Sequence, residues 1–275
     1  IGITAVDLEQ NEHRGIAQVT KNVIAALRSE KANIFLITSY GSSRLQKNDI
    51  NSLSKTAIKE ITLSDILEEL KESKKSKSEY QKKLFLYLKL PKAIIKYYFN
   101  SGELSGTKYL LDNHHKSIHS DTQRMSYIKD LKGIISIPNI FNICKLKSLR
   151  VIFCMPKINL KKYDLDVLIS TSPLSLKIVN DGICKRKLIQ IIHDAIPLLY
   201  NKHPDKPVQF YHRLKDAIQA DKVIFVSESS KKIVNNILEI KDIEIKKYNV
   251  INPLPSISHI LLNKASSINP NFNTK

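Results

Sequence analysis

Two pairs of polar residues in this chain directly follow short runs of apolar residues. His193 and Asp194 come after the apolar run 188–192, and Ser227 and Glu228 come after the next apolar run along the chain. An imidazole can hydrogen bond to a sugar hydroxyl or to charge that develops in a transition state, and a carboxylate can orient it. Open α/β sheets bind ligands just past the carboxyl ends of their strands. These four residues are therefore the first candidates for a site.

A second candidate lies near the start of the chain, in the loop that holds Arg14 and Gly15. Residues 1–6 read as a strand, residues 16–29 as a helix with one apolar face, and residues 34–38 as a second strand. A residue without Cβ lets a phosphate or a sugar approach the backbone, and the helix that follows offers free N–H groups. The alternative is a plain tight turn, because the three-glycine dinucleotide fingerprint is absent.

The strand–helix–strand order predicts an α/β protein with a Rossmann-like, mainly parallel sheet flanked by helices. We expect one domain over residues 1–255, with residues 256–275 forming a tail or a linker. Residues 64–148 are irregular, and we expect them to form a helical or irregular insertion outside the sheet. The residues expected on adjacent buried strands are Ile3, Phe35, Val167, Ile191 and Phe225.

Composition limits the classes of partner. The formal net charge is +18, but aromatic residues make up only 7% of the chain and do not alternate with basic ones, which argues against a nucleic-acid interface. The charge reflects either compositional drift or attraction to anions such as a membrane surface or a sugar phosphate. Residues 84–99 mix apolar residues with lysines, and form either an interfacial membrane helix or an amphipathic helix packed on the sheet. No stretch is long and apolar enough to span a bilayer.

The cysteines and histidines give no sign of a metal site. The cysteines show no paired spacing and lie near apolar residues, so we expect buried, reduced thiols in a cytosolic protein. His115 and His119 have helical spacing without the glutamate of a metalloprotease motif, so we expect them and His114 to be exposed or in loops. The cysteines are Cys144, Cys154 and Cys184.

Three segments in order resemble the amino-terminal half of the two-Rossmann-domain (GT-B type) glycosyltransferases of family 4. They are RGIAQVTKNVIAAL at 14–27, IIHDAIPL at 191–198 and ADKVIFVSESSKKIV at 220–234. The resemblance implies a retaining transfer of a hexose from a nucleotide diphosphate sugar to the hydroxyl of a glycan or lipid-linked acceptor. It implies no metal and no other cofactor, and a cytoplasmic enzyme that can contact the inner face of an anionic membrane.

The resemblance also assigns roles to the candidate residues. It places Arg14 and Gly15 at a cleft between two domains, near the donor phosphates and the acceptor. It makes His193 the residue that contacts the transferred sugar, while Asp194 orients it, binds acceptor hydroxyls or only caps a loop. Ser227 and Glu228 would then contact a substrate, and a plain helix cap at Ser229 or Ser230 is the alternative for these serines.

One departure from the family matters for activity. The second Rossmann domain, which binds the nucleotide sugar and carries a Glu-x7-Glu motif, does not follow in this sequence. Glu60 and Glu68 have that spacing, but they lie in the first third of the chain, in another context. We therefore expect the isolated chain to be inactive without a donor-binding domain or subunit. The alternatives are a non-catalytic module that binds an acceptor or a partner and, as a weaker option, a flavodoxin-like regulatory domain.

Overall fold

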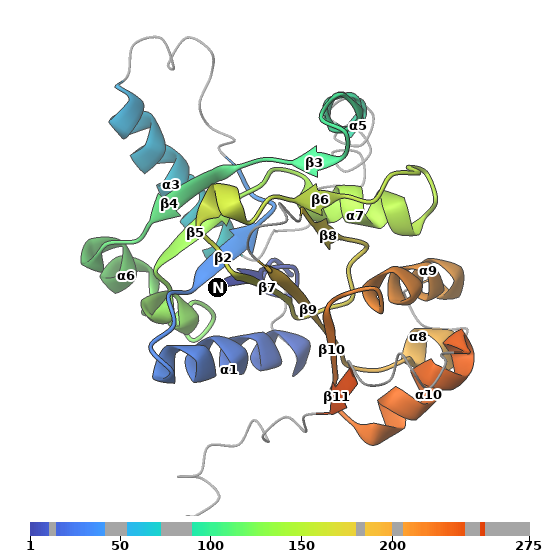
Figure 1. Ribbon diagram of the computed structural model, residues 1–275. Coiled ribbons are helices and arrows are strands. Elements are labelled where there is room, and N and C mark those ends of the chain that lie inside the picture. The colour runs from blue at the N-terminus through green and yellow to red at the C-terminus, as the bar shows by residue number, and fades with distance from the viewer. Residues whose placement is uncertain are drawn as a thin grey trace, which may run out of the picture.

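Eight strands form the central sheet, in the order β11-β10-β9-β7-β1-β2-β5-β4 (Figure 1). The computed structural model describes residues 1–10, 15–41, 54–72, 90–179, 185–199, 206–239 and 248–250. All neighbouring strands are parallel except β4 and β5, which are antiparallel. In sheet order the strands are Tyr248–Val250, Lys222–Phe225, Lys187–Ile192, Val167–Ser170, Gly2–Thr4, Phe35–Thr38, Gly133–Ser136 and Thr107–Leu110.

The predicted central strands are confirmed. Ile3, Phe35, Val167, Ile191 and Phe225 lie on β1, β2, β7, β9 and β10, which are five consecutive parallel strands of the sheet. These strands are short and rich in Ile, Leu and Val because helices cover both faces of a parallel sheet. The fold class is therefore α/β with a mainly parallel sheet, which is compatible with a Rossmann-like fold.

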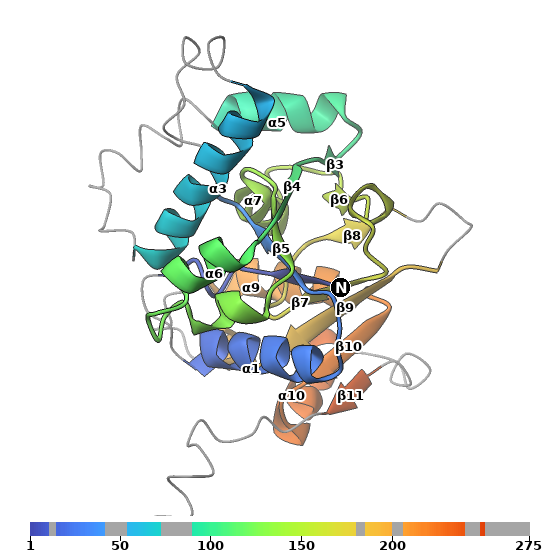
Figure 2. The same ribbon diagram turned by 90° about the vertical axis from the view of Figure 1, so that its left-hand side faces the viewer.

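One face of the sheet is covered by α1 (Gly15–Ser29), α3 (Lys55–Lys71) and the 3-10 helix η1 (Ser126–Asp130), with α6 (Asn113–His119) beside them (Figure 2). Helix α1 buries Ala17, Thr20 and Ile24, whose spacing of three and four residues puts them on one helical face. Ala17 and Ile24 join Ile3 and other strand residues in one apolar cluster.

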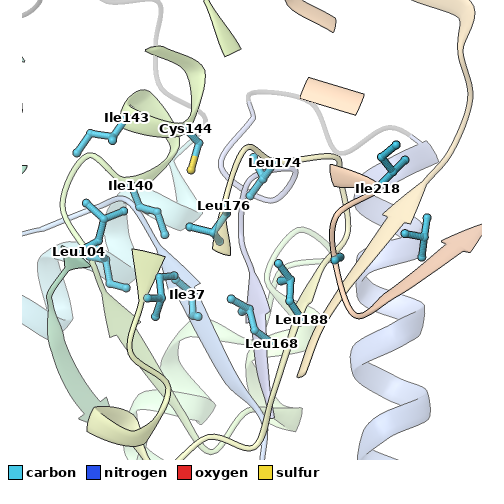
Figure 3. Packing of buried hydrophobic residues seen from close by; sticks show 14 of the residues in the cluster. Ile37, Leu104, Ile140, Ile143, Cys144, Leu168, Leu174, Leu176, Leu188 and Ile218 are labelled. Carbon is cyan, nitrogen blue, oxygen red and sulfur yellow. The ribbon is translucent and has the colours of Figure 1, made fainter. Parts of the chain in front are cut away.

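The opposite face carries α7 (Ile140–Ser148), α9 (Pro207–Ala217) and α10 (Glu228–Leu238). A small parallel sheet of β3 (Glu103–Leu104), β6 (Lys157–Ile158) and β8 (Lys177–Ile178) adds to this side. Figure 3 shows Leu168 and Leu188 of the central sheet in the same cluster as Leu104 and Cys144. The remaining helices are α5 (Leu90–Phe99), η2 (Lys161–Tyr163) and the short α8 (Ile196–Leu199).

The prediction that residues 64–148 lie outside the sheet is wrong. Within this segment β5 pairs with β2, and β4 forms the antiparallel edge beside β5. The pattern was hard to find because β5 is only four residues long, and β4 is half exposed and carries little apolar periodicity. The expected tail, residues 256–275, lies outside the described residues.

The thiols follow the prediction only in part. Cys144 is buried in the core, and burial raises the pKa of its thiol to about 12, whereas Cys154 is exposed at the surface. Cys184 lies outside the described residues. Among the helices that the structure describes, none is long and apolar enough to cross a membrane.

The inclusion of β4 in the sheet can be tested at Gly133. A Cβ at this position would lie 2.2 Å from the carbonyl oxygen of Tyr109, which belongs to the neighbouring strand β4. We expect Gly133→Ala to lower the free energy of unfolding by roughly 1–3 kcal/mol because the two strands must separate locally. Urea denaturation of the full chain measures this.

Gly15→Ala is the matched control, since a Cβ there meets no atom within 4 Å. We expect its free energy of unfolding to be unchanged or slightly higher. A Gly133→Ala variant as stable as Gly15→Ala would show that β4 does not pair closely with β5.

Candidate functional site

The order in which successive strands are added to the sheet changes sides between β1 and β7, although the two strands are parallel. From β1 the chain proceeds to β2 and β5 on one side, while β7, β9, β10 and β11 follow one another on the other side. Such a reversal separates the loops that leave two adjacent parallel strands, and ligands of open α/β sheets bind at this point. The loops after β1, β7 and β9 are therefore where a site is expected.

Asp7 lies at this reversal and is 3% exposed. Thr171 donates a hydrogen bond from Oγ1 to Oδ2 of Asp7 over 3.0 Å, and Ser172 donates from Oγ to Oδ1 over 2.7 Å. Asp7 belongs to the loop after β1, and the two hydroxyls follow β7, which pairs directly with β1. A carboxylate of the first strand is thus held by the end of a strand more than 160 residues away in sequence.

The pKa of Asp7 is raised above its ordinary value because burial disfavours the charged form. Hydrogen bonds from Ser172 and Thr171 and the nearby charges of His193 and Arg213 act in the opposite direction and reduce the increase. Burial outweighs these four contributions. Asp7 is therefore a carboxyl group whose proton is held more tightly than that of an exposed aspartate.

His193 follows β9 and is fixed from two sides. Its Nε2 lies 2.7 Å from the carbonyl oxygen of Thr171, and its own carbonyl accepts a hydrogen bond of 2.8 Å from Oγ of Ser230. A carbonyl oxygen can only accept, so Nε2 carries the hydrogen and Nδ1 is the nitrogen with the lone pair in the neutral ring. The expected position of His193 at the carboxyl edge of the sheet is therefore observed, with the ring beside the loop after β7.

Asp194 occupies a different role from that of an orienting group. Its Oδ1 accepts a hydrogen bond of 3.0 Å from the backbone N–H of Ile196, the first residue of α8. This is the local turn contact that aspartate makes readily. The group that orients the ring of His193 is the carbonyl of Thr171. In this structure Asp194 caps the loop, which is one of the alternatives that the sequence analysis gave for it.

Ser227 and Glu228 lie where α10 begins. Ser227 is the N-cap, and its Oγ accepts a hydrogen bond of 3.0 Å from the backbone N–H of Ser230. The cap is therefore Ser227 and not Ser229 or Ser230, because the strand ends at Phe225 and Ser227 is still in an extended conformation. Glu228 is exposed in the first turn, where its charge is favourable for the helix dipole.

Gly15 is the first residue of α1 and is exposed, with no acidic residue in the first turn of the helix. A Cβ at Gly15 would meet open space, so packing within the protein does not demand a glycine there. Arg14 lies outside the described residues. Gly15 and His193 both follow carboxyl ends of parallel strands, with β7 between their strands.

Glu9 is a site residue that the sequence analysis missed. Its Oε1 accepts hydrogen bonds from Oγ1 of Thr38 at 2.6 Å and from the backbone N–H of Ser39 at 2.7 Å, and its Oε2 accepts from the Ser39 hydroxyl. The loop after β1 is also held by Arg124, which donates to the carbonyl of Gln10 over 2.7 Å. Glu9 thus ties the loop after β1 to the loop after β2.

Together these contacts connect the ends of five adjacent strands. Glu9 joins the loops after β2 and β1, Asp7 joins those after β1 and β7, His193 joins those after β7 and β9, and Ser230 joins those after β9 and β10. We call this series of contacts the edge network. Asp7, Glu9, Thr171 and Ser172 were not among the predicted site residues, although each follows the end of an apolar strand, which was the available signal.

Metal binding finds no support in the part of the chain that the structure describes, where no group of three or more His, Cys, Asp or Glu residues could hold an ion. The histidines near residue 115 lie on α6 rather than in a loop. The ring of His115 lies 2.7 Å from Asp112 and 3.3 Å from Glu60, and His119 is buried. The prediction that these histidines are exposed or in loops is therefore confirmed for His114, which is exposed, and is wrong for His115, whose side chain is only 14% exposed, and for His119.

Comparison of the chain with protein-family models, with curated proteins and with solved structures gives no match. The chemistry available at the carboxyl edge of the sheet follows from the groups that lie there. The ring of His193 can hydrogen bond to a ligand through Nδ1, a buried carboxyl group lies two contacts away, and the start of α1 follows the same edge. Such a set can bind a polar ligand with hydroxyl or phosphate groups.

The raised pKa of Asp7 predicts how the stability of the protein depends on pH. Because the folded state favours the protonated carboxyl, its contribution is fully present below about pH 4 and is lost as pH rises through the raised pKa. An amide keeps hydrogen bonding to both hydroxyls without the charge. We expect Asp7→Asn to match the natural chain in acid and to exceed its free energy of unfolding by about 1 kcal/mol at neutral pH.

Asp112→Asn is a control with the opposite sign. A backbone hydrogen bond from His115 lowers the pKa of Asp112, so its contribution is present at neutral pH and lost as pH falls through that lowered value. We expect this variant to be less stable than the natural chain at neutral pH and equal to it in acid. Urea titrations across this pH range measure both; an Asp7→Asn variant that loses stability at neutral pH would refute the burial argument.

Proposed function

We propose that this chain is the acceptor-side half of a retaining glycosyltransferase of the two-Rossmann-domain type, similar to family 4. In the complete enzyme, a hexose would pass from a nucleotide diphosphate sugar to an acceptor hydroxyl. The observation that supports this best is the position of His193 at the carboxyl edge, next to the reversal between β1 and β7, with its ring held by Thr171. A sugar placed at this edge would meet the imidazole and the loop that holds Asp7.

In this proposal His193 acts through Nδ1. Because Nε2–H is engaged by the Thr171 carbonyl, the neutral ring can accept a hydrogen bond at Nδ1 from a sugar hydroxyl, and the protonated ring can donate one to developing negative charge. The carbonyl of Thr171 holds the ring, and the hydroxyl of Ser230 holds the backbone carbonyl of His193, before substrate arrives. A preorganised donor of this kind needs no reorganisation during the reaction.

The phosphates of the donor are assigned to the start of α1. Its first N–H groups have no partner within the helix, and no acidic side chain in the first turn competes with an anion there. Arg14 would add a positive charge, and Gly15 would let the phosphate approach the backbone. Asp194, Ser227 and Glu228 are proposed to contact acceptor hydroxyls. The proposed reaction uses no metal and no further cofactor, and takes place in the cytoplasm.

A non-catalytic module that binds an acceptor or a partner is the second candidate. One observation favours it: both carboxylate oxygens of Asp7 and the hydroxyl of Ser227 are engaged in contacts within the protein. Groups that stabilise the fold in this way need not take part in chemistry. The two candidates differ in what happens when a donor-binding domain is supplied.

The isolated chain is expected to show no sugar transfer and at most weak affinity for nucleotides, because in enzymes of the proposed type the nucleotide is gripped by the donor-side half and not by the acceptor-side half. Isothermal titration calorimetry with uridine and guanosine diphosphate sugars measures the affinity directly. Micromolar binding of either compound to this chain would contradict the assignment to the acceptor side.

The role of His193 can be tested once a donor-binding domain is joined to the chain. We expect His193→Ala to lower turnover by about 10²-fold or more while the free energy of unfolding changes little, since the group acts on charge in the transition state. His114→Ala is the matched control, because His114 is exposed on α6 away from the edge network. If His193→Ala keeps the turnover of His114→Ala, His193 is structural and the binding-module candidate is favoured.

A further inference from the structure

Helix α6, which lies beside α3 (Figure 2), carries a buried histidine outside the edge network. His119 is the last residue of α6 and is 8% exposed, and its Nδ1 is buried without a hydrogen-bond partner in the described part of the chain. Protonation of the ring would add a positive charge and leave a buried N–H that lacks an acceptor, which is costly. Helix α6 therefore packs with His119 in its neutral form.

Charged groups of α3 and of α6 itself act on this ring. Burial lowers the pKa of His119 below its ordinary value of 6.5. Lys71, the last residue of α3, and His115 of α6 lower this pKa further, whereas Glu68 of α3 raises it. The 3-10 helix η1 also packs against α6, but the shift receives no contribution from its charged residues, Lys129 and Asp130.

His115 links α6 to α3 and responds to acid in the opposite sense. Its Nδ1 lies 2.7 Å from Oδ1 of Asp112, the N-cap of α6, and its Nε2 lies 3.3 Å from Oε2 of Glu60 on α3. The ring can donate to both carboxylates only when it is protonated, so protonation strengthens this bridge. The side chains of Asp112 and Glu60 are 64% and 60% exposed, and such exposed ion pairs contribute little. The cost of a buried charge at His119 is larger, so acid weakens the packing of α6.

The turn that follows α6 is bonded to two segments of the candidate site. Arg124 donates from Nη2 to the carbonyl of Gln10 in the loop after β1 over 2.7 Å, and from Nε to the carbonyl of Leu70 over 3.0 Å. Lys21 of α1 donates from Nζ to the carbonyl of Gln123 over 3.0 Å. The turn thus joins the end of α3 to the loop after β1 and to α1, and α6 is the helix directly before it.

We propose that protonation of His119 releases α6 from α3 and, through the turn after α6, loosens the loop after β1 and helix α1. Acid thereby weakens the hold of Arg124 on the loop that carries Asp7 and Glu9. The released histidine meets water and regains its ordinary pKa of 6.5, so release becomes more favourable as pH falls below 6.5 and levels off below the lowered pKa of the packed ring. The proposal concerns the position of these segments and does not depend on the reaction proposed above.

Amide hydrogen exchange followed by NMR on the full chain measures this release. The N–H of Ser120 bonds to the carbonyl of Lys116 over 3.0 Å and reports on α6, and the N–H of Glu9 bonds to the carbonyl of Ala5 over 2.9 Å and reports on the loop after β1. Between neutral pH and about pH 5.5 we expect both protection factors to fall, that of Ser120 by up to about tenfold per pH unit. Leu165 is buried in the turn after η2, and its amide should keep its protection.

The variant His119→Leu separates this ring from the other titrating groups. Leucine cannot be protonated, so we expect the amides of Ser120 and Glu9 to keep in acid the protection that they have at neutral pH. His114→Ala is the matched control on the same helix. It should show the pH dependence of the natural chain, because His114 is exposed.

Charge variants on α3 test the direction of the effect without altering the buried ring. Lys71→Gln removes a charge that lowers the pKa of His119, so that pKa lies closer to 6.5 and we expect a smaller fall in the protection of Ser120. Glu68→Gln removes the charge that raises this pKa, so we expect a larger fall. The two variants keep the test decisive if His119→Leu does not fold, and shifts in the reverse directions would contradict the proposal.

Three further results would overturn the proposal. The first is equal protection of Ser120 at neutral and acid pH in the natural chain. The second is a folded His119→Leu variant that loses protection in acid as the natural chain does, which would assign the pH dependence to another group. The third is release of α6 without any change at Glu9, which would show that the turn after α6 does not couple the two segments.

Discussion

The burial of one carboxyl group governs the arrangement of the site. Asp7 stands at the point where the sheet reverses direction, and a buried carboxylate is costly unless hydrogen bonds compensate for the lost water. Thr171 and Ser172 supply these bonds, which fixes how the loop after β7 runs. The carbonyl of Thr171 is then in place to receive Nε2 of His193. The position of His193 thus follows from the hydrogen bonds that the buried carboxyl group of Asp7 requires.

The edge network explains how the loops at this edge of the sheet are positioned relative to one another. Each contact joins the ends of two neighbouring strands, so the position of one loop sets that of the next. Asp7 and Thr171 are both buried, so the bond between them is stronger than it would be in water, and its loss would leave a buried polar group without a partner. The pKa of Asp7 is nevertheless raised, because the effect of burial is larger than that of its hydrogen bonds.

The five central strands could be predicted from the sequence because their apolar runs are bounded by polar residues and turns. Prediction failed for β4, whose residues are half exposed and show little apolar periodicity, and for β5, which pairs with β2 far earlier in the chain. At the site, the position of His193 could be predicted from a strand end alone. The role of Asp7 could not, since it depends on hydroxyls that only the pairing of β1 with β7 brings near.

The central position of β1 has a consequence for synthesis of the chain on the ribosome. Strand β1 leaves the ribosome before both of its sheet neighbours: β2 follows within 40 residues, but β7 begins only at residue 167. Until that strand leaves the exit tunnel, one edge of β1 and the carboxyl of Asp7 lack their native partners. An unpaired strand edge is prone to association with other chains. The nascent protein therefore passes through a long interval in which a chaperone has the most to protect at β1.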